Sequence, residues 1–145
     1  MIGLIQRVTH AHVSVDEQII GQINKGTVLL LGVEKLDTTE NMKLLAKKVA
    51  NFRMFEDENG KMNKSLLDIE GQLLVVSQFT LVADTHKGNR PGFSNGASPE
   101  HGLAMYESFI AHFEAEYLPC QSGRFGANMQ VALVNDGPAT FTIKV

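Results

Sequence analysis

The chain has 145 residues, with 13 basic and 16 acidic side chains and a formal net charge of −3. This length predicts one domain spanning residues 1–145, and the bulk charge does not indicate a nucleic-acid partner. The single cysteine, Cys120, excludes an intramolecular disulfide and a zinc site built from cysteines.

The first residues show no basic segment followed by an apolar core, so a secretory signal is not predicted. The longest apolar run, residues 27–33, is far too short to span a bilayer. We therefore expect a cytoplasmic protein with no membrane segment.

The first 33 residues show the pattern of β-strands. Residues 2–8 alternate between two faces, as the side chains of a strand do. Residues 12–16 and 18–23 are expected to pair as a hairpin across residues 16–18. Residues 26–33 are continuously apolar, which is typical of a strand covered on both faces.

The next segment predicts one helix and one further strand. Asp37 and Glu40 have the spacing of a capping box, so we expect the helix to begin there. The apolar side chains that follow at helical spacing are Met42, Leu45, Val49 and Phe52. The opposite surface carries Lys43, Lys47 and Lys48. The pair Asn59-Gly60 predicts a turn, and residues 72–84 have the apolar character of a second buried strand.

The second half of the chain predicts a loop, a helix and two strands. Residues 85–97 are polar and rich in glycine, and Ser98 with Pro99 then opens a helix as N-cap and first helical residue. The expected buried stripe of this helix is Leu103, Tyr106, Ile110, Phe113 and Tyr117. Two strands, 128–135 and 139–145, are expected to close the chain. These elements predict a mixed α/β domain in which long helices cover a largely antiparallel sheet.

The histidines do not form a recognisable catalytic or metal site. They are His10, His12, His86, His101 and His112. The first pair alternates on a strand without a third ligand, and the last pair shares a helix face without a ligand at a suitable offset. We expect surface or structural roles for them, and no catalytic role for Cys120, which has no histidine close in sequence.

Two other polar segments are candidates for a site. Ser77, Gln78 and Thr80 follow four apolar residues, so their polar groups are expected to emerge at the end of a strand. A serine there can also be a core residue bonded to the backbone, and both interpretations stay open. The loop at 85–97 suits phosphate and base contacts, or is a solvated crossover. The side chains that favour contacts are Lys87, Arg90 and Phe93.

The segment NDGPAT at 135–140 also allows two interpretations. Asp-Gly between two strands is a common hairpin turn. A plain two-residue hairpin does not need a proline, however, and Gly137-Pro138 joins the most permissive backbone to the most restricted one. A cis bond at this pair would fix two carbonyl oxygens that could bind an ammonium group without any side chain.

Two motifs resemble those of the D-aminoacyl-tRNA deacylase family. The family's Ser-Gln-Phe-Thr and Asn-x-Gly-Pro-x-Thr signatures match SQFTL at 77–81 and NDGPAT at 135–140, in the same order and with matching separation. Further segments that look like this family are MIGLIQRV, GKMN, RPGFSNGASP and GRFGANMQV. The resemblance therefore covers the whole chain, and it implies a layered fold with a barrel-like sheet core covered by two long helices.

The resemblance implies an activity and a partner. Members of this family hydrolyse the ester between a D-amino acid and the 3′-terminal adenosine of a tRNA, and glycine is also accepted. They are homodimers in which the Gly-cis-Pro of one subunit enters the pocket of the other. Carried over, the main-chain carbonyls of Gly137 and Pro138 would bind the α-amino group, and an L-side chain would meet the protein wall. No cofactor and no metal are implied.

Further residues acquire roles from the same resemblance. The residues that would line the catalytic site are Ser77, Gln78, Phe79 and Thr80, with backbone amides stabilising the oxyanion. The ribose 2′-hydroxyl of the tRNA would help to activate water. Thr80 as a nucleophile ranks second, because no base is indicated nearby. Arg7 would brace the Gly-Pro segment, and Phe125 and Met129 would pack near the terminal adenine. Asn135 and Thr140 complete the second motif.

Two rival functions stay open at this point. A non-catalytic RNA-binding module would share the basic loop and the aromatic side chains. A generic serine or threonine esterase would require Ser77 or Thr80 and would cleave small esters. For the phosphates of a tRNA we expect contacts from one of two surfaces, either Lys43, Lys47 and Lys48 or Lys87 and Arg90.

Overall fold

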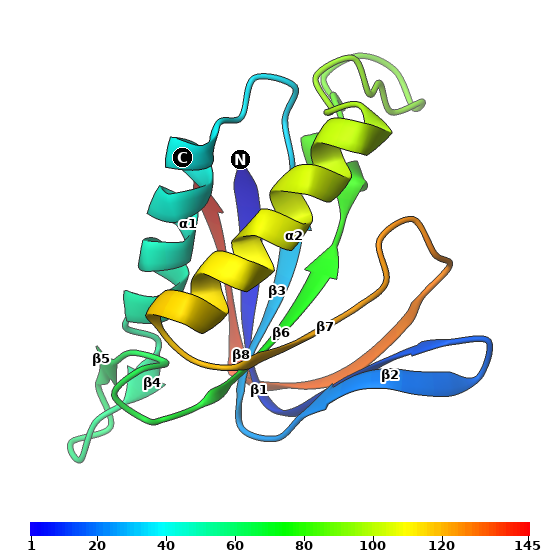
Figure 1. Ribbon diagram of the computed structural model, residues 1–145. Coiled ribbons are helices and arrows are strands. Elements are labelled where there is room, and N and C mark those ends of the chain that lie inside the picture. Colours follow the sequence, from blue (N-terminus) through cyan, green and yellow to red (C-terminus); the bar gives the residue numbers. More distant parts are fainter.

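The computed structural model describes residues 1–145 and shows a six-stranded sheet with two helices on one face (Figure 1). In chain order the elements are β1 (Ile2–Val15), β2 (Gln18–Ile23), β3 (Gly26–Gly32), α1 (Thr39–Asn51), β4 (Phe55–Glu56), β5 (Met62–Lys64), β6 (Gln72–Ser77), the 3-10 helix η1 (Phe79–Val82), α2 (Pro99–Glu116), β7 (Cys120–Ser122) and β8 (Gln130–Lys144). No helix combines the length and apolar character needed to cross a membrane.

The long strand β1 organises the sheet. It pairs antiparallel with β3 through its first half, with β2 through its second half and with β8 along almost its whole length. β6 adds to β3 and β7 adds to β6, both in parallel. Because β2 also lies against β6 and β7, the sheet curls into a nearly closed, barrel-like shape. The predicted mixed, largely antiparallel α/β class is confirmed.

Both faces of the sheet are apolar. The larger core of 19 buried residues lies between the sheet and the two helices, and a second core of seven lies on the inner side of the curled sheet. Leu29 and Leu31 enter the first core, whereas Val28 enters the second, as the alternation of a strand requires. The prediction that residues 26–33 form a strand covered on both faces is confirmed.

The two helices begin at caps, one of which differs from the expectation. Ser98 caps α2 by accepting a hydrogen bond from the backbone N–H of His101 at 3.2 Å, with Pro99 at the first position as predicted. For α1 the predicted Asp37–Glu40 capping box is wrong, because Thr38 and Asn41 form it instead. The predicted stripe of α2 is wrong at Leu103, which is exposed.

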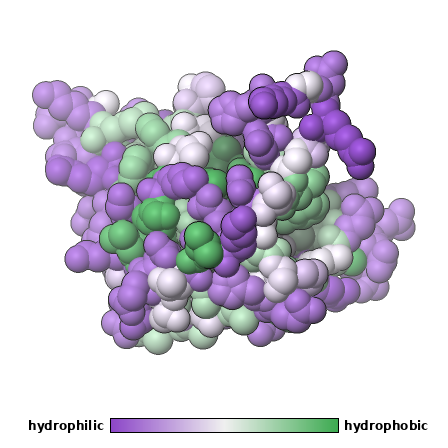
Figure 2. Space-filling view, turned by 90° about the horizontal axis from the view of Figure 1, so that it is seen from above, coloured by the Kyte–Doolittle hydropathy of each residue, from purple (hydrophilic) through white to green (hydrophobic).

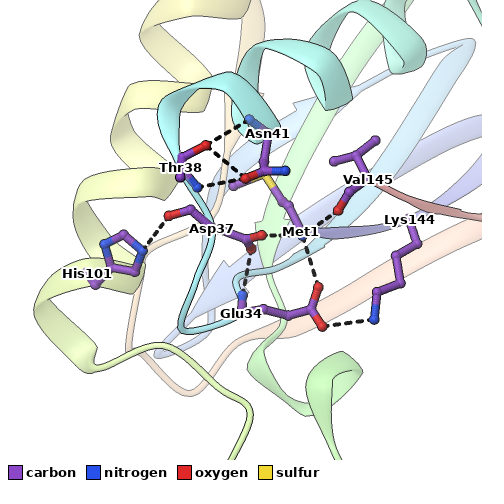
Figure 3. A network of polar contacts seen from close by, with 8 residues as sticks. All are labelled: Met1, Glu34, Asp37, Thr38, Asn41, His101, Lys144 and Val145. Carbon is purple, nitrogen blue, oxygen red and sulfur yellow. Dashed lines mark hydrogen bonds and ion pairs between the residues drawn. The ribbon is translucent and has the colours of Figure 1, made fainter.

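Asp37 is drawn away from the cap by the buried ammonium group of Met1 (Figure 3). This ammonium forms ion pairs with Asp37 and with Glu34, the latter at 3.0 Å, and donates to the carbonyl of Val145 at 3.1 Å. The start of β1, the segment before α1 and the end of β8 are therefore tied at one point. A sequence pattern could not reveal this, because the partners are distant in the chain.

Three strand boundaries also differ from the predictions. β6 ends at Ser77 and η1 begins at Phe79, so the strand predicted over 72–84 is too long. The three-residue strand β7 was not predicted, because it is too short to show a periodicity. The two strands expected at 128–135 and 139–145 are one strand, β8, which keeps the same partner, β1, on both sides of 135–140, so the hairpin interpretation of this segment is wrong.

Candidate functional site

A cavity of about 480 Å³ opens at the end of β6. Its walls come from β3, the β6–η1 junction, the start of α2 and the segment between β7 and β8. The lining residues that matter most below are Ser77, Gln78, Phe79, Tyr106, Phe125 and Met129. Seen from above, apolar atoms gather around a hollow beside the polar loop that precedes α2 (Figure 2). The lining is predominantly apolar, which is typical of a ligand site.

The 3-10 helix η1 begins beside the cavity. Ser77 pairs with Leu31 at the end of β6, and the chain then turns into η1 at Phe79. The first N–H groups of a helix, here those of Phe79 and Thr80, have no partner within that helix and can donate to a ligand. The hydroxyl of Thr80 accepts a hydrogen bond from the side-chain amide of Gln78 at 2.5 Å. An amide is not a base, so this contact does not activate the hydroxyl.

Aromatic side chains frame the cavity. Phe79 and Phe93 lie at its mouth, with ring centroids 5.1 Å apart, and Phe79 is 66% exposed. Phe125 packs over Gly102 and Tyr106 deeper inside, because a glycine on α2 leaves room for its ring. Two aromatic surfaces that face a cavity can stack with a planar base.

Tyr106 connects the walls of the cavity. Its hydroxyl donates to the carbonyl of Val75 on β6 at 2.9 Å and lies 3.1 Å from the carbonyl of Gly123. Burial raises the pKa of this hydroxyl to about 12, and the nearby Cys120 adds to the shift. Tyr106 therefore stays neutral at physiological pH and holds α2, β6 and the segment after β7 together.

The Gly137–Pro138 segment is a bulge in β8. Asn135 pairs with Val8 and Thr140 pairs with Gln6, so residues 136–139 face only one residue of β1 and leave the ladder. The peptide bond between Gly137 and Pro138 is cis, and both residues are exposed.

The side chain of Asn135 closes this bulge from within the strand. Its amide nitrogen donates to the hydroxyl of Thr140 at 2.7 Å, and its amide oxygen accepts from the N–H of Ala139 at 2.8 Å. The second bond satisfies a backbone N–H that has left the ladder at the bulge. They give a physical reason for asparagine and threonine at the two ends of the motif.

Arg7 supports the bulge from below. Its guanidinium donates to the carbonyl of Asp136 at 2.9 Å and to the carbonyl of Met54 at 2.7 Å, and Arg7 is only 6% exposed. Gly137 has φ +126°, and a Cβ there would lie 2.7 Å from a guanidinium nitrogen of Arg7. Only glycine fits this backbone and this close approach.

The bulge and the cavity do not meet within one chain. Arg7 pairs with Thr27 on β3, whereas Ser77 pairs with Leu31 of that strand. These rows are roughly 13 Å apart along the strands, and β8 lies three strand spacings, about 14 Å, from β6. The structure therefore brings Ser77, Gln78, Phe79, Phe125 and Met129 together, and places Arg7, Asn135, Gly137, Pro138 and Thr140 elsewhere. Thr80 lies next to the cavity and does not line it.

Comparisons with known proteins decide the family. The model of a family described as D-Tyr-tRNA(Tyr) deacylase matches residues 4–144. The chain belongs to the D-aminoacyl-tRNA deacylase family. It is 57% identical to the D-aminoacyl-tRNA deacylases of Alteromonas mediterranea and Shewanella baltica over all 145 residues, and each alignment covers the whole of both chains. As a member of this family, the chain is a hydrolase.

Two solved structures share the fold of this deacylase family member. One, described as c-Myc DNA Unwinding Element Binding Protein, is 39% identical, with a TM-score of 0.96 over 100% of this chain and 99% of the other. The other, a probable eukaryotic D-amino acid tRNA deacylase, has a TM-score of 0.82 at 16% identity and covers 98% of each chain. The second likeness concerns the fold alone.

Acid–base side chains are scarce in the cavity of this deacylase family member. None of the histidines lines it, and His101 contacts the carbonyl of Asp37 at 3.0 Å instead. Burial, followed by the charge of Glu114, raises the pKa of the Cys120 thiol to about 12, so this thiol remains protonated. No three His, Cys, Asp or Glu residues lie together as metal ligands.

Sequence reasoning missed several residues that shape the cavity. Tyr106 was expected only in the buried stripe of α2, and Gly102 was not singled out, because their contacts with Phe125 cross between distant segments. Phe93 was noted as a base-contacting aromatic of the loop, but not as a partner of Phe79. The glycine at α2 was the one available sequence signal, since glycine inside a helix often has a packing reason.

Proposed function

We propose that this chain hydrolyses the ester of D-aminoacyl-tRNA, releasing the D-amino acid and the tRNA, in the cytoplasm. The observation that carries this proposal is the exposed Gly137–Pro138 bulge, which Arg7 and Asn135 hold in one conformation by hydrogen bonds to its backbone. A bulge supported in this way would offer main-chain carbonyls rather than a side chain to a substrate. Its position outside the cavity suits a role in completing a second copy's site.

The carbonyls of Gly137 and Pro138 would accept hydrogen bonds from the α-ammonium group of the substrate. With that group and the ester both fixed, the two remaining substituents of the α-carbon have defined directions. A D-side chain then points outward, whereas an L-side chain would collide with the cavity wall. Glycine has no side chain to exclude, so we propose that glycyl-tRNA is also hydrolysed.

A homodimer follows from the separation of the two motifs. The Gly137–Pro138 bulge of one subunit would enter the cavity next to Phe79 of its partner, since the two are far apart within one chain. Exposed apolar side chains at the cavity mouth, Phe79 and Phe93, would become covered by this contact. Each of the two equivalent sites would then combine residues of both subunits.

The ester cleavage would use backbone groups of the protein and a hydroxyl of the tRNA. The N–H groups of Phe79 and Thr80 would stabilise the negative charge that develops on the carbonyl oxygen. Phe125 and Met129 would hold the terminal adenosine, and its ribose 2′-hydroxyl would orient or activate the attacking water. The hydrogen bond from Gln78 to Thr80 supports this reading over a threonine nucleophile, which would need a base.

Deacylation of D-Tyr-tRNA and L-Tyr-tRNA by the purified protein tests the activity directly. We expect release of D-tyrosine only, and strongly reduced release when the tRNA ends in 2′-deoxyadenosine. Equal cleavage of both substrates would contradict the chiral site. Binding of tRNA without cleavage of either substrate would favour a non-catalytic RNA-binding module.

Two alanine variants separate the tRNA-assisted mechanism from a generic esterase. Ser77→Ala and Thr80→Ala each remove a hydroxyl near the cavity and leave the backbone N–H groups in place. We expect at least one of them to retain deacylation of D-Tyr-tRNA. Loss of activity in both, together with fast cleavage of small D-amino esters by the wild-type protein, would instead identify a hydroxyl nucleophile.

A further inference from the structure

A second, shallower depression runs along α1 and the end of β8. It has a volume of about 760 Å³ and lies outside the cavity described above. Its lining residues are Leu44, Lys47, Lys48, Asn51, Phe52, Arg53, Thr142, Ile143 and Lys144. Four of these nine are basic and none is acidic, in a chain whose net charge is −3. We call this depression the basic groove.

Most of the positive charge in the basic groove is uncompensated. Lys47 and Lys48 are exposed and form no ion pair with any carboxylate. Arg53 is held by Asn63, a neutral partner, through its Nε bond to the carbonyl of that residue at 2.8 Å. Only Lys144 is paired, with Glu34 at 2.9 Å. An array of free cations in a depression concentrates positive potential there and attracts polyanions.

The basic groove begins beside the Gly137–Pro138 bulge. Arg7 donates to the carbonyl of Asp136 and to that of Met54, and Met54 directly follows Arg53 in the chain. The neighbouring Phe52 packs against Phe141 of β8 with ring centroids 5.0 Å apart. From the bulge, β8 continues through Thr142 to Lys144 along the groove. The same buried arginine thus fixes the bulge and one end of the groove.

We propose that the basic groove binds the phosphate backbone of the tRNA whose 3′ end lies in the partner subunit's cavity. This inference rests on the proposed function, because the bulge enters the site of the other subunit. A substrate held at its amino group by the bulge has its polynucleotide chain next to the surface that carries the bulge. The basic groove adjoins that surface, through Arg53 on one side and Thr142 on the other, so each tRNA would contact both subunits.

The chemistry of the groove favours a phosphodiester backbone over an acidic peptide or a small anion. Its cations come from the end of α1, the segment after this helix and the end of β8, so they are spread along the groove as the charges of a phosphodiester chain are. Lys47 and Lys48 are long and exposed, and they lack the fixed geometry that a specific carboxylate site requires. Contacts of this kind give affinity without reading the base sequence, which suits an enzyme that accepts many tRNAs.

Binding of uncharged tRNA as a function of salt concentration tests the groove without using catalysis. The test variant is Lys47→Gln/Lys48→Gln, and the matched control is Lys25→Gln/Lys61→Gln, which has the same change in charge on exposed lysines outside the groove. We expect the slope of log K against log salt to fall by roughly 1.4 to 1.8 in the test variant. An unchanged slope, or an equal fall in both variants, would overturn the proposal that the basic groove binds tRNA.

A minimal substrate separates failure of the groove from failure of the proposed function. A D-tyrosyl ester of adenosine has the reacting group but no polynucleotide. We expect the test variant to cleave this ester like the wild-type protein and to be impaired only with D-Tyr-tRNA. An inactive wild-type protein would contradict the proposed function, while the salt slopes would still decide whether the groove binds tRNA.

Mixed dimers test whether the groove serves the partner's cavity. Gly137→Ala disables the bulge of one subunit, so that only that subunit's own cavity remains complete. We expect slow cleavage of D-Tyr-tRNA when the groove substitutions lie on the other subunit, and fast cleavage when they lie on the Gly137→Ala subunit. Both dimers contain the same substitutions, so equal rates would overturn the arrangement across subunits.

Discussion

Arg7 is a buried cation whose close partners are main-chain oxygens. It donates to the carbonyls of Asp136 and Met54, and the carboxylate of Asp136 lies 3.7 Å away. Hydrogen bonds from a charged donor are stronger than neutral ones, so this arginine fixes backbone positions well. Its value to the proposed site is therefore geometric, because it holds the backbone of Asp136, the residue before Gly137, in place.

Gly137→Ala is expected to disable the bulge. An added Cβ would lie 2.7 Å from the Arg7 guanidinium at a φ of +126°, which costs about 1–3 kcal/mol of stability. Displacing the carbonyls by about 1 Å should lower kcat/KM for D-Tyr-tRNA roughly a hundredfold. Single-turnover deacylation and thermal unfolding measure the two effects.

Gly60→Ala is the matched control for this substitution. Gly60 also has positive φ, at +72°, but no atom lies within 4 Å of an added Cβ. We expect a stability loss of about 1 kcal/mol from backbone strain and unchanged deacylation. Equal activity losses in both variants would mean that strain alone, and not the contact with Arg7, matters.

Asp37→Asn is expected to destabilise the fold by about 3 kcal/mol, because it removes a buried partner of the Met1 ammonium. Glu34 and the carbonyl of Val145 remain as partners, so the protein should still fold. Urea unfolding measures the change. Glu40→Gln, on the exposed surface of α1, should change stability by less than about 0.5 kcal/mol. A wild-type stability for Asp37→Asn would refute this role.

At the residue scale, the sequence predicted identities better than contacts. The two motifs indicated the family, and the resemblance to that family then assigned roles to residues such as Ser77 and Gly137. The partners of Asp37 and Tyr106 could not be predicted, because each contact joins segments that are distant in the chain. Local patterns such as a capping box are satisfied by several residues, and tertiary contacts then choose among them.

The strand β8 shows how a local signal can mislead at the scale of elements. Asn-Asp-Gly favours positive φ and a break in the ladder, which occurs both in hairpin turns and in bulges. Neighbouring strands decide between the two, and β1 is long enough to pair with β8 on both sides of the break. Most other elements were predictable, because their periodicity or caps lie within a few residues.

The anchoring of α2 to β6 by Tyr106 leads to a prediction on pH. Its pKa of about 12 in the folded protein exceeds the ordinary value of 10, so folding favours the protonated hydroxyl. This contribution is fully present below pH 10 and is lost as the pH rises toward 12. We expect Tyr106→Phe to cost about 1–2 kcal/mol at neutral pH and to show a weaker loss of stability above pH 10.

Phe109→Leu provides a comparison for Tyr106→Phe, because it alters the same helix without touching a hydroxyl. Phe109 is fully buried, so this variant should be destabilised at every pH and keep the wild-type slope above pH 10. Unfolding in urea at several pH values distinguishes the two. A wild-type slope for Tyr106→Phe would assign the alkaline loss to other groups.

On the scale of the whole molecule, the fold places the cavity and the Gly137–Pro138 bulge far apart, although the proposed reaction needs both at one substrate. The cavity lies at the end of β6 and the bulge lies on β8, on the far side of β1 and β3. Within one chain, Tyr106 holds the walls of the cavity together, and Arg7 supports the bulge. Neither part alone could both hold the amino group and stabilise the oxyanion, which is why the proposed active unit is a pair of chains.

Complementation between two inactive variants tests this division. Gly137→Ala leaves the cavity intact and disables the bulge. Ala127 lines the cavity, so Ala127→Trp should fill the cavity and leave the bulge intact. Each homodimer should retain no more than roughly a hundredth of the wild-type activity on D-Tyr-tRNA. After the subunits are mixed and reassociated, half of the dimers are mixed and each has one complete site, so activity should recover to about a quarter of wild type. If each chain completed its own site, no mixture of these variants would regain activity, because every chain would carry one defective part.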